Sequence, residues 1–185
     1  LGHDWGGVVS LGWAARHPEL VAGVATLNTA VHQPEGAPIP APLQAALAGP
    51  VLPASTVTTD AFLSVTTSLA TPALDRETRA AYHLPYDAAA RRGGVGGFVA
   101  DIPADPGHGS HPELQRVGED LASLGRTDVP ALILWGADDP VFLDRYLDDL
   151  RDRLPRARVH RYEQAGHLLV DDRDITAPLL QWPQL

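Results

Sequence analysis

Short apolar runs alternate with helical stretches along this chain, and that order restricts the folds open to it. Residues 20–28 form an apolar run with β-branched side chains, and residues 129–135 are apolar apart from Pro130 near the start. Both runs are typical of buried strands in a parallel sheet, and residues 157–167 indicate a further strand that runs into a loop. Strands that alternate with helices predict a parallel sheet of the α/β class.

Four segments have the apolar spacing or the end signals of helices that would cover such a sheet. The first, residues 6–17, ends before Pro18, and the others are residues 111–125, 143–155 and 174–182. The expected apolar face of the first helix consists of Val8, Val9, Leu11, Gly12 and Ala15. The expected apolar face of the third consists of Leu143, Tyr146, Leu147, Leu150 and Leu154.

A proline-rich segment, residues 31–60, interrupts this alternation. Proline at this density breaks regular elements into short helices and turns. Residues 60–70 and 75–83 are predicted to be short helices, and the glycine-rich stretch 91–97 is either a flexible joint or the start of a helix. The chain therefore carries an insert between its first strands and its last ones.

Charge and composition exclude several classes of function. The chain has 185 residues, no cysteine and a net charge of −9 with histidine neutral. An acidic chain is a poor partner for nucleic acid, and without cysteine there are no disulfides or thiolate metal sites. No apolar run reaches the about 20 residues of a transmembrane helix, and no signal sequence opens the chain. We expect a cytoplasmic protein that acts on an apolar small molecule, with no nucleic-acid partner and no transmembrane segment.

The opening stretch, GHDWGG, has the pattern of a nucleophile elbow, in which a strand turns sharply into a helix and exposes the residue at the turn. Asp4 occupies that position. Gly2 and Gly6 flank it, where side chains are expected to collide with the strained backbone, and Gly7 leaves room for close packing of the helix on the sheet. The backbone N–H of Trp5 can stabilise a developing anion.

An elbow needs a strand before it, and of that strand only Leu1 is expected to remain. The chain contains no methionine, including at position 1, and three whole strands are too few for an open sheet covered on both faces. We therefore expect a fragment that begins in the middle of its fold. Residues 24–28 should lie beside what remains of the elbow strand.

Two later segments supply the partners of such a nucleophile in the order nucleophile, acid, histidine. The strand LILWG is followed by Asp138 and Asp139, and the next strand leads to Gly166 and His167. A histidine at a strand end can reach over the elbow as a general base oriented by a strand-end acid. The GxDxG pattern alone arises easily by chance, but the three pieces together indicate a catalytic triad.

The other histidines have weaker claims to a function. His17 suits the C-terminal end of its helix, and His108 and His111 in DPGHGSHP are more typical of a solvated loop than of a metal site. His32 is expected near the entrance of the site, either as a lining residue or as a bystander. No metal ion or cofactor is expected.

From Leu1 to its C-terminus, the chain resembles the haloalkane dehalogenase and epoxide hydrolase branch of the α/β-hydrolases. The stretches that carry the resemblance are GHDWGG, VATLNTAV, LILWGADDPVF and AGH. The resemblance implies an α/β-hydrolase fold with a core from residues 1–30 and 116–185 and a mostly helical cap from residues 31–115. The cap stretch LPYDAAARRGGVGGFVADIPADPGHGSHPEL is further similar to the β-lactone decarboxylases of bacterial olefin biosynthesis.

The resemblance also implies roles for single residues. Asp4 would be the nucleophile, and the indole N–H of Trp5 would bind the leaving group. In this branch the acid follows either of two strands, and the earlier position corresponds to Asn28, which cannot ionise. The family spacing Gly-x-x-Asp from Gly136 then selects Asp139 rather than its neighbour. A cap tryptophan, a second leaving-group donor in some dehalogenases, has no counterpart in residues 31–115.

An aspartate nucleophile suits an electrophilic sp³ carbon, such as that of a haloalkane, an epoxide or a β-lactone. The first hypothesis is a decarboxylase that converts a long apolar dialkyl β-lactone to an alkene. The alternatives are a dehalogenase or epoxide hydrolase, in which water activated by His167 cleaves the enzyme ester, and an inactive fragment. Tyr82 and Tyr86 are either acids for epoxide opening or packing residues. The resemblance also implies an assembly with other enzymes of olefin biosynthesis.

Overall fold

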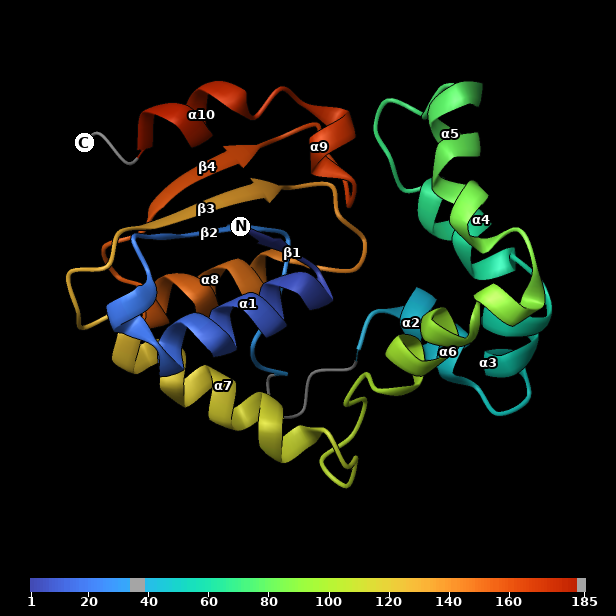
Figure 1. The fold of residues 1–185 in the computed structure, drawn as a ribbon, viewed down its shortest axis with the longest axis horizontal. Helices are drawn as coiled ribbons and strands as arrows, with labels where there is room; N and C mark the ends of the chain where they lie inside the picture. Colours follow the sequence, from blue (N-terminus) through green and yellow to red (C-terminus); the bar gives the residue numbers. More distant parts are fainter. Residues whose placement is uncertain (34–38, 183–185) are drawn as a thin grey trace.

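The computed structural model describes residues 1–33 and 39–182 and contains a four-stranded parallel sheet (Figure 1). Its order is β1-β2-β3-β4, and β2 pairs with β1 through Gly2 and Thr26 and with β3 through Val24 and Ala131. The strands are Gly2–His3, Val24–Leu27, Ala131–Gly136 and Arg158–Tyr162. The parallel α/β class and the pairing of 24–28 with the elbow strand are confirmed. The expectation that only Leu1 remains of the elbow strand is wrong, because Gly2 and His3 form that strand and Leu1 precedes it.

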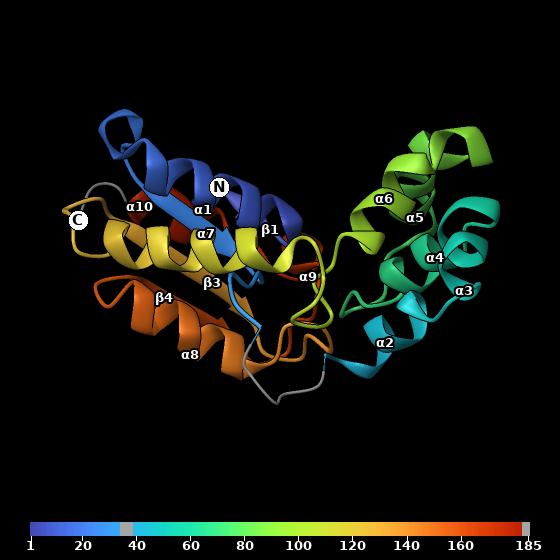
Figure 2. The ribbon, with the colours of Figure 1, turned by 90° about the horizontal axis from the view of Figure 1, so that it is seen from below.

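Three helices cover one face of the sheet: α1 (Trp5–Arg16), α7 (His111–Leu124) and α8 (Asp144–Arg153) (Figures 1 and 2). They pack on alternate side chains of β3, which include Ile133 and Trp135, both fully buried. The other face carries α9 (Leu169–Asp172) and α10 (Thr176–Gln181), which pack on Leu132 and Leu134. Because β3 is buried on both faces, its sequence is apolar without alternation.

The predicted helices are present, but two side chains that were expected on their buried faces are exposed. Val9 is 63% exposed because it lies one position off the face formed by Leu11 and its neighbours one turn away. Leu143 precedes α8 and is 42% exposed. α7 packs against α1 along its length and crosses the expected boundary at residue 115.

The insert lies beyond the carboxyl ends of the strands as a separate group of short helices (Figures 1 and 2). Its helices are α2 (Ala41–Leu47), α3 (Val51–Pro53), α4 (Ala61–Thr67), α5 (Arg76–His83) and α6 (Gly93–Ala100). A π-turn at Ala54–Thr58 and 3₁₀ turns at Leu84–Tyr86 and Ala89–Arg91 complete it. The glycine-rich stretch is thus the start of a helix. Carboxyl ends of parallel strands are where α/β proteins place their sites, so the insert covers that position.

A buried arginine holds the insert together. Arg92 is 7% exposed and donates hydrogen bonds to the carbonyl oxygens of Val57, Tyr86 and Thr58, at 2.9, 2.8 and 3.2 Å. Three acceptors satisfy most of its donors, as burial of a guanidinium requires. The sequence analysis had assigned Arg92 only to a flexible or helical stretch.

Candidate active site

Asp4 stands at the turn between β1 and α1 in a conformation that few residues adopt. Its φ is 50° and its ψ is −127°, and it is the only non-glycine residue with positive φ among those the structure describes. The backbone around it is fixed by hydrogen bonds from Asp4 N to the Asn28 carbonyl (3.0 Å) and from Thr29 Oγ1 to the Asp4 carbonyl (2.7 Å). Such strain persists where the surrounding structure holds it, which is the property of a nucleophile elbow.

Two of the three elbow glycines are required by close contacts. A Cβ at Gly2 would lie 2.5 Å from the Gly6 carbonyl oxygen, and a Cβ at Gly7 would lie 2.3 Å from Thr29 Oγ1. The expectation for Gly6 is wrong, because a Cβ there would meet nothing within 4 Å. Gly6 is on the exposed side of α1, away from the backbone that crowds the turn.

Asp139 is buried directly after β3 and is fully used as an acceptor. One carboxylate oxygen, Oδ1, accepts from the backbone N–H groups of Val141 (2.7 Å) and Phe142 (3.1 Å). The other, Oδ2, lies 3.0 Å from His167 Nδ1 and 2.9 Å from Asn28 Nδ2. The neighbouring Asp138 is exposed. These contacts with four nitrogen atoms from three parts of the chain fix the position of the Asp139 carboxylate.

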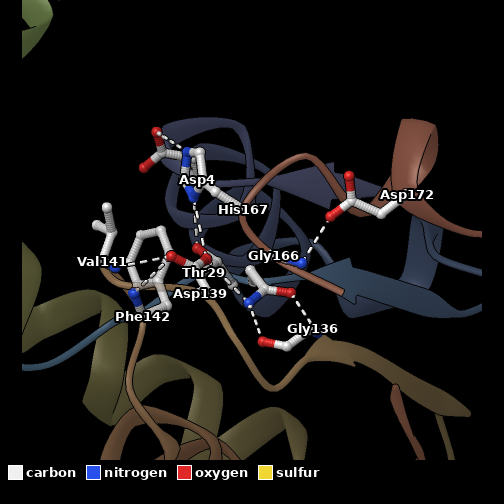
Figure 3. A network of polar contacts seen from close by, with 10 residues as sticks. Asp4, Thr29, Gly136, Asp139, Val141, Phe142, Gly166, His167 and Asp172 are labelled. Atoms are coloured by element: carbon white, nitrogen blue, oxygen red, sulfur yellow. Dashed lines mark hydrogen bonds and ion pairs between the residues drawn. The ribbon is translucent and has the colours of Figure 1, made fainter. Parts of the chain in front are cut away.

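His167 lies between the two carboxylates (Figure 3). Its Nδ1 faces Asp139, and its Nε2 is 3.8 Å from Asp4 Oδ2. Burial by itself lowers the pKa of His167, but the hydrogen bond to Asp139 and the charges of Asp139, Asp4 and Asp172 outweigh it and raise that pKa above the usual 6.5. The structure therefore brings Asp4, Asp139 and His167 together from three separate parts of the chain.

Two rings confine the imidazole of His167. The Phe142 ring is stacked on it with centroids 5.8 Å apart, and the His3 ring is tilted at 4.9 Å. Burial and the neighbouring His167 lower the pKa of His3, so that His3 favours the neutral form. His3 had been assigned no role from the sequence.

Asn28 has a structural role that its sequence position only partly indicated. It is fully buried, and its amide donates to the Gly136 carbonyl oxygen (2.9 Å) and accepts from the Gly136 N–H (2.7 Å). The same Nδ2 donates to Asp139. The usable signal was its place at the end of the strand beside β3, since neighbouring parallel strands end at one edge of the sheet.

Asp172 is another residue to which no sequence motif assigns a role. Its carboxylate oxygens accept from the backbone N–H of Thr71 and from that of Gly166, each at 2.6 Å. Burial raises the pKa of Asp172, although both hydrogen bonds oppose that change. The available signal was an acid five residues after His167.

A cavity of about 490 Å³ lies between the carboxyl ends of the strands and the insert. Asp4, Trp5 and His167 contribute to its wall, and His32 lines it too, which decides between the two placements expected for that residue. Most of the remaining wall is apolar and comes from the insert and neighbouring loops, with Leu43, Phe62, Val65, Leu69, Val95, Phe98, Val99 and Ile102 among its residues. Such a wall suits an apolar ligand.

The tyrosines of the insert lie outside this cavity. Neither Tyr82 nor Tyr86 is among the described residues that line it. The Tyr82 hydroxyl donates to Asp171 at 2.6 Å, and burial together with this bond raises its pKa to about 12. Tyr82 therefore ties the insert to α9 and is not placed to donate a proton to a bound molecule.

In residues 1–33 and 39–182 no group of three or more His, Asp or Glu side chains is arranged to hold a metal ion. His108 instead contacts the carbonyl oxygen of Ala100, at the end of α6, and accepts from the N–H of Ser110. Over the same residues, no helix has the length and apolarity needed to cross a bilayer.

The fold and the elbow define the class of protein. The chain belongs to the alpha/beta hydrolase fold family, whose model matches residues 1–174. This confirms the fold class predicted from the sequence.

Among curated proteins, the chain is 36% identical over 176 residues to cis-3-alkyl-4-alkyloxetan-2-one decarboxylase of Shewanella oneidensis, covering 92% of this chain and 54% of that protein. It is 30% identical over 182 residues to the decarboxylase of the same name from Xanthomonas campestris, covering 97% and 60%. Haloalkane dehalogenase 1 of Mycobacterium tuberculosis is 28% identical over 188 residues, covering 98% and 59%. The chain thus spans between half and two thirds of the length of these relatives. Haloalkane dehalogenases and β-lactone decarboxylases, two of the enzyme groups that it was expected to resemble, are among them.

Solved structures show the same fold. Haloalkane dehalogenase DatA of Agrobacterium tumefaciens matches with a TM-score of 0.83 at 16% identity, covering 98% of this chain and 64% of that one. Haloalkane dehalogenase DbeA of Bradyrhizobium matches with a TM-score of 0.78 at 21% identity, covering 98% and 65%. At these identities the likeness concerns the fold alone.

Proposed function

We propose that Asp4, Asp139 and His167 are the nucleophile, acid and histidine of a catalytic triad, and that the protein carrying this chain decarboxylates a long-chain dialkyl β-lactone to an alkene. The observation that carries the proposal is the 3.8 Å approach of His167 Nε2 to an aspartate at a strained elbow, beneath an apolar cavity. The decarboxylase name of the relatives at 36% and 30% identity supports the lactone over other substrates.

The chemistry balances without water or a cofactor. A carboxylate oxygen of Asp4 attacks the ring sp³ carbon that bears the ring oxygen, and the bond between that carbon and oxygen breaks. The products are an ester at Asp4 and a free carboxylate on the adjacent carbon. Loss of carbon dioxide then supplies the electron pair of the new double bond, and the Asp4 carboxylate leaves. Attack with inversion places the two breaking bonds of this second step opposite each other, which is the geometry that elimination needs.

In this reaction His167 stabilises negative charge and does not act as a base. The raised pKa of His167 favours its protonated form. An imidazolium held by Asp139 beside the elbow stabilises the carboxylate that the ring opening releases. Trp5, the next residue along, lines the cavity and is proposed to donate its indole N–H to the leaving group.

The residues 31–115 are proposed to act as a cap. Their helices supply most of the apolar wall of the cavity, and an apolar wall suits two alkyl chains better than a polar substrate. An assembly with other enzymes of olefin biosynthesis stays a prediction.

A dehalogenase or epoxide hydrolase is the second candidate function. The 28% identity to haloalkane dehalogenase 1 favours it, as does a histidine–aspartate pair within reach of Asp4. In that reaction neutral His167 would take a proton from water, and the hydroxide would attack the ester carbonyl of Asp4. The bond between that carbonyl carbon and the alkoxy oxygen would break, and the product would leave as an alcohol with the proton from His167. One oxygen of water would then remain in the Asp4 carboxylate.

The test supplies a cis-dialkyl β-lactone and a haloalkane in separate reactions run in water enriched in oxygen-18. Decarboxylation predicts alkene and carbon dioxide in equal amounts, with no heavy oxygen in the peptide that contains Asp4. Hydrolysis predicts heavy oxygen in that peptide after several turnovers. Asp4→Asn should abolish both reactions, because a neutral amide is a poor nucleophile.

Alkene formation that persists in Asp4→Asn would overturn the nucleophile assignment. Turnover of the haloalkane with labelled Asp4, and none of the lactone, would favour the second candidate. A folded protein that turns over neither of these substrates, nor an epoxide, would favour the inactive alternative.

A further inference from the structure

Three consecutive residues at the end of α9 connect the sheet to the insert. The Tyr82 hydroxyl of α5 donates to Asp171, and Arg173 donates to the Thr71 carbonyl oxygen at 3.3 Å. Asp172 lies between these two contacts and is 5% exposed, whereas Asp171 and its tyrosine partner are at the surface. Asp172 is therefore buried, although the residues on either side of it are not.

Each carboxylate oxygen of Asp172 serves a different part of the molecule. Oδ1 accepts from the backbone N–H of Thr71, in the insert, and Oδ2 accepts from the backbone N–H of Gly166, directly before His167 (Figure 3 shows the second). Both distances are 2.6 Å, at the short end of the range for hydrogen bonds from a backbone N–H. One side chain thus joins the insert to the loop that carries the histidine.

The backbone of the insert also packs directly on that loop. A Cβ at Gly166 would lie 2.5 Å from the carbonyl oxygen of Leu69 and 3.4 Å from Asp172 Oδ2. Leu69 is two residues before Thr71, and its side chain lines the cavity. The cavity wall at Leu69 and the start of the His167 loop are therefore in contact, and Asp172 bonds both segments.

We propose that Asp172 is a positioning residue for the triad, holding the His167 loop and the Leu69–Thr71 segment in one fixed arrangement. In this role it sets the reach of His167 toward Asp4, although it touches neither the substrate nor the nucleophile. The inference rests on the function proposed above for His167. Small displacements of a reacting group have large effects on rate, which is why a buried, two-sided anchor matters at this position.

The substitution Asp172→Asn tests the proposal because the side chain keeps its shape and loses one acceptor. An amide has one oxygen and one N–H₂ group, and the N–H₂ group would face a backbone N–H. We expect kcat for the lactone to fall roughly 10- to 100-fold, with KM changed less than about threefold, because the loss concerns the reacting geometry and not binding. Backbone hydrogen exchange at Gly166 or Thr71 should become about 10-fold faster.

Three matched controls separate positioning from attachment of the insert and from charge. Tyr82→Phe removes a tie between the insert and α9 without touching the histidine loop. Asp171→Asn removes a neighbouring charge but keeps an acceptor for Tyr82. Asp174→Asn removes an exposed charge that bonds only the nearby Thr176 N–H among the contacts described. All three should keep kcat within about threefold of the parent protein.

The outcomes are distinguishable. Unchanged kcat in folded Asp172→Asn, or an equal loss in Tyr82→Phe, would contradict the positioning role. If the parent protein turns over no lactone or haloalkane, the proposed function fails, and hydrogen exchange at Gly166 and Thr71 still decides whether Asp172 holds both segments. If Asp172→Asn does not fold, Asp172→Glu keeps both acceptors but displaces them by one methylene. It should lower kcat by less than the Asn variant is expected to, and an unchanged kcat there would overturn the proposal.

Discussion

The side-chain amide of Asn28 donates a 2.9 Å hydrogen bond to the same Asp139 oxygen that faces His167. The two residues are 111 positions apart in the chain and meet because β2 and β3 are neighbours that end at the same edge of the sheet. A further pair of bonds holds Asn28 to both backbone groups of Gly136. Asn28 therefore fixes the carboxylate and the strand end that carries it.

Removal of this amide should cost both stability and rate. Asn28→Ala removes the side-chain partner of the Gly136 N–H and carbonyl groups and one of the two contacts of Asp139 Oδ2, so we expect a loss of about 2–4 kcal/mol in the free energy of unfolding. We expect kcat to fall as well, because Asp139 loses a donor that orients it. Thermal or urea unfolding and steady-state kinetics measure the two effects.

Thr26→Val, two residues earlier in β2, is the matched control. Thr26 is 1% exposed, and its Oγ1 has no hydrogen-bond partner among the residues that the structure describes. Its replacement should change stability by less than about 1 kcal/mol, or increase it, because an unpaired polar atom leaves the core. Equal losses in the two variants would show that Asn28 contributes only volume.

The two acids after β3 should differ in their effect on rate. Asp139→Asn removes the charge that faces His167 Nδ1, and a comparable change in a serine triad lowers kcat by about 10⁴. Asp138→Asn alters an exposed side chain and should leave kcat within about threefold of the parent. Steady-state rates of the two variants, compared after both are shown to be folded, test the assignment. A larger loss of kcat in Asp138→Asn than in Asp139→Asn would show that Asp138 is the acid of the triad.

The pH dependence of rate should separate the two candidate reactions. The pKa of His167 lies above 6.5 because Asp139 and the charges of Asp4 and Asp172 outweigh the effect of burial. Decarboxylation assisted by the imidazolium should slow as pH rises through this pKa, whereas ester hydrolysis by neutral imidazole should accelerate over the same range. Rates measured with the lactone and with the haloalkane from about pH 5 to 9 show whether turnover falls or rises through the pKa of His167.

The same shift affects stability, with a definite sign. A histidine whose pKa is raised on folding stabilises the folded state fully below its unfolded pKa of 6.5, and that contribution is lost as pH rises through the raised value. His167→Gln should therefore flatten the loss of stability between neutral and mildly alkaline pH. Unfolding midpoints measured across that range for both proteins check the sign, and parallel curves would contradict it.

The elbow glycines should respond in opposite directions to alanine. Gly7→Ala places a Cβ against Thr29, the residue whose hydroxyl holds the Asp4 carbonyl, so we expect a loss of about 1–3 kcal/mol and of activity. Gly6→Ala meets nothing within 4 Å and gains helix propensity, so it should stabilise by up to about 1 kcal/mol. Unfolding curves measure both, and destabilisation by Gly6→Ala would show that the first turn of α1 needs its glycine for another reason.

The class of fold and the three principal site residues followed from local signals in the sequence. The apolar run before Gly136 and the helical spacing in residues 143–155 indicate their elements because burial imposes the periods of strand and helix on the chain. The elbow is recognisable from a local motif as well, since its glycines lie within a few positions of Asp4, although the residues that hold its strained backbone, Asn28 and Thr29, come from β2 and the loop after it. That the strand at 24–28 pairs with the elbow strand was also predictable, because sequential elements of a parallel sheet are often neighbours.

Other features depended on contacts between distant segments, which no local pattern specifies. Asp172 meets Thr71 across 101 residues, and Asn28 acquires its role only when β2 and β3 lie side by side. The same is true of Tyr82, whose hydroxyl donates to Asp171 in α9 and does not face the cavity. It is also true of Gly6, because the motif suggested crowding there but a Cβ would meet nothing within 4 Å. By itself the sequence determined which residues could form the elbow, the acid and the histidine. Which neighbours fix and enclose them was decided by the tertiary structure, because packing of the insert and the strand ends sets those contacts.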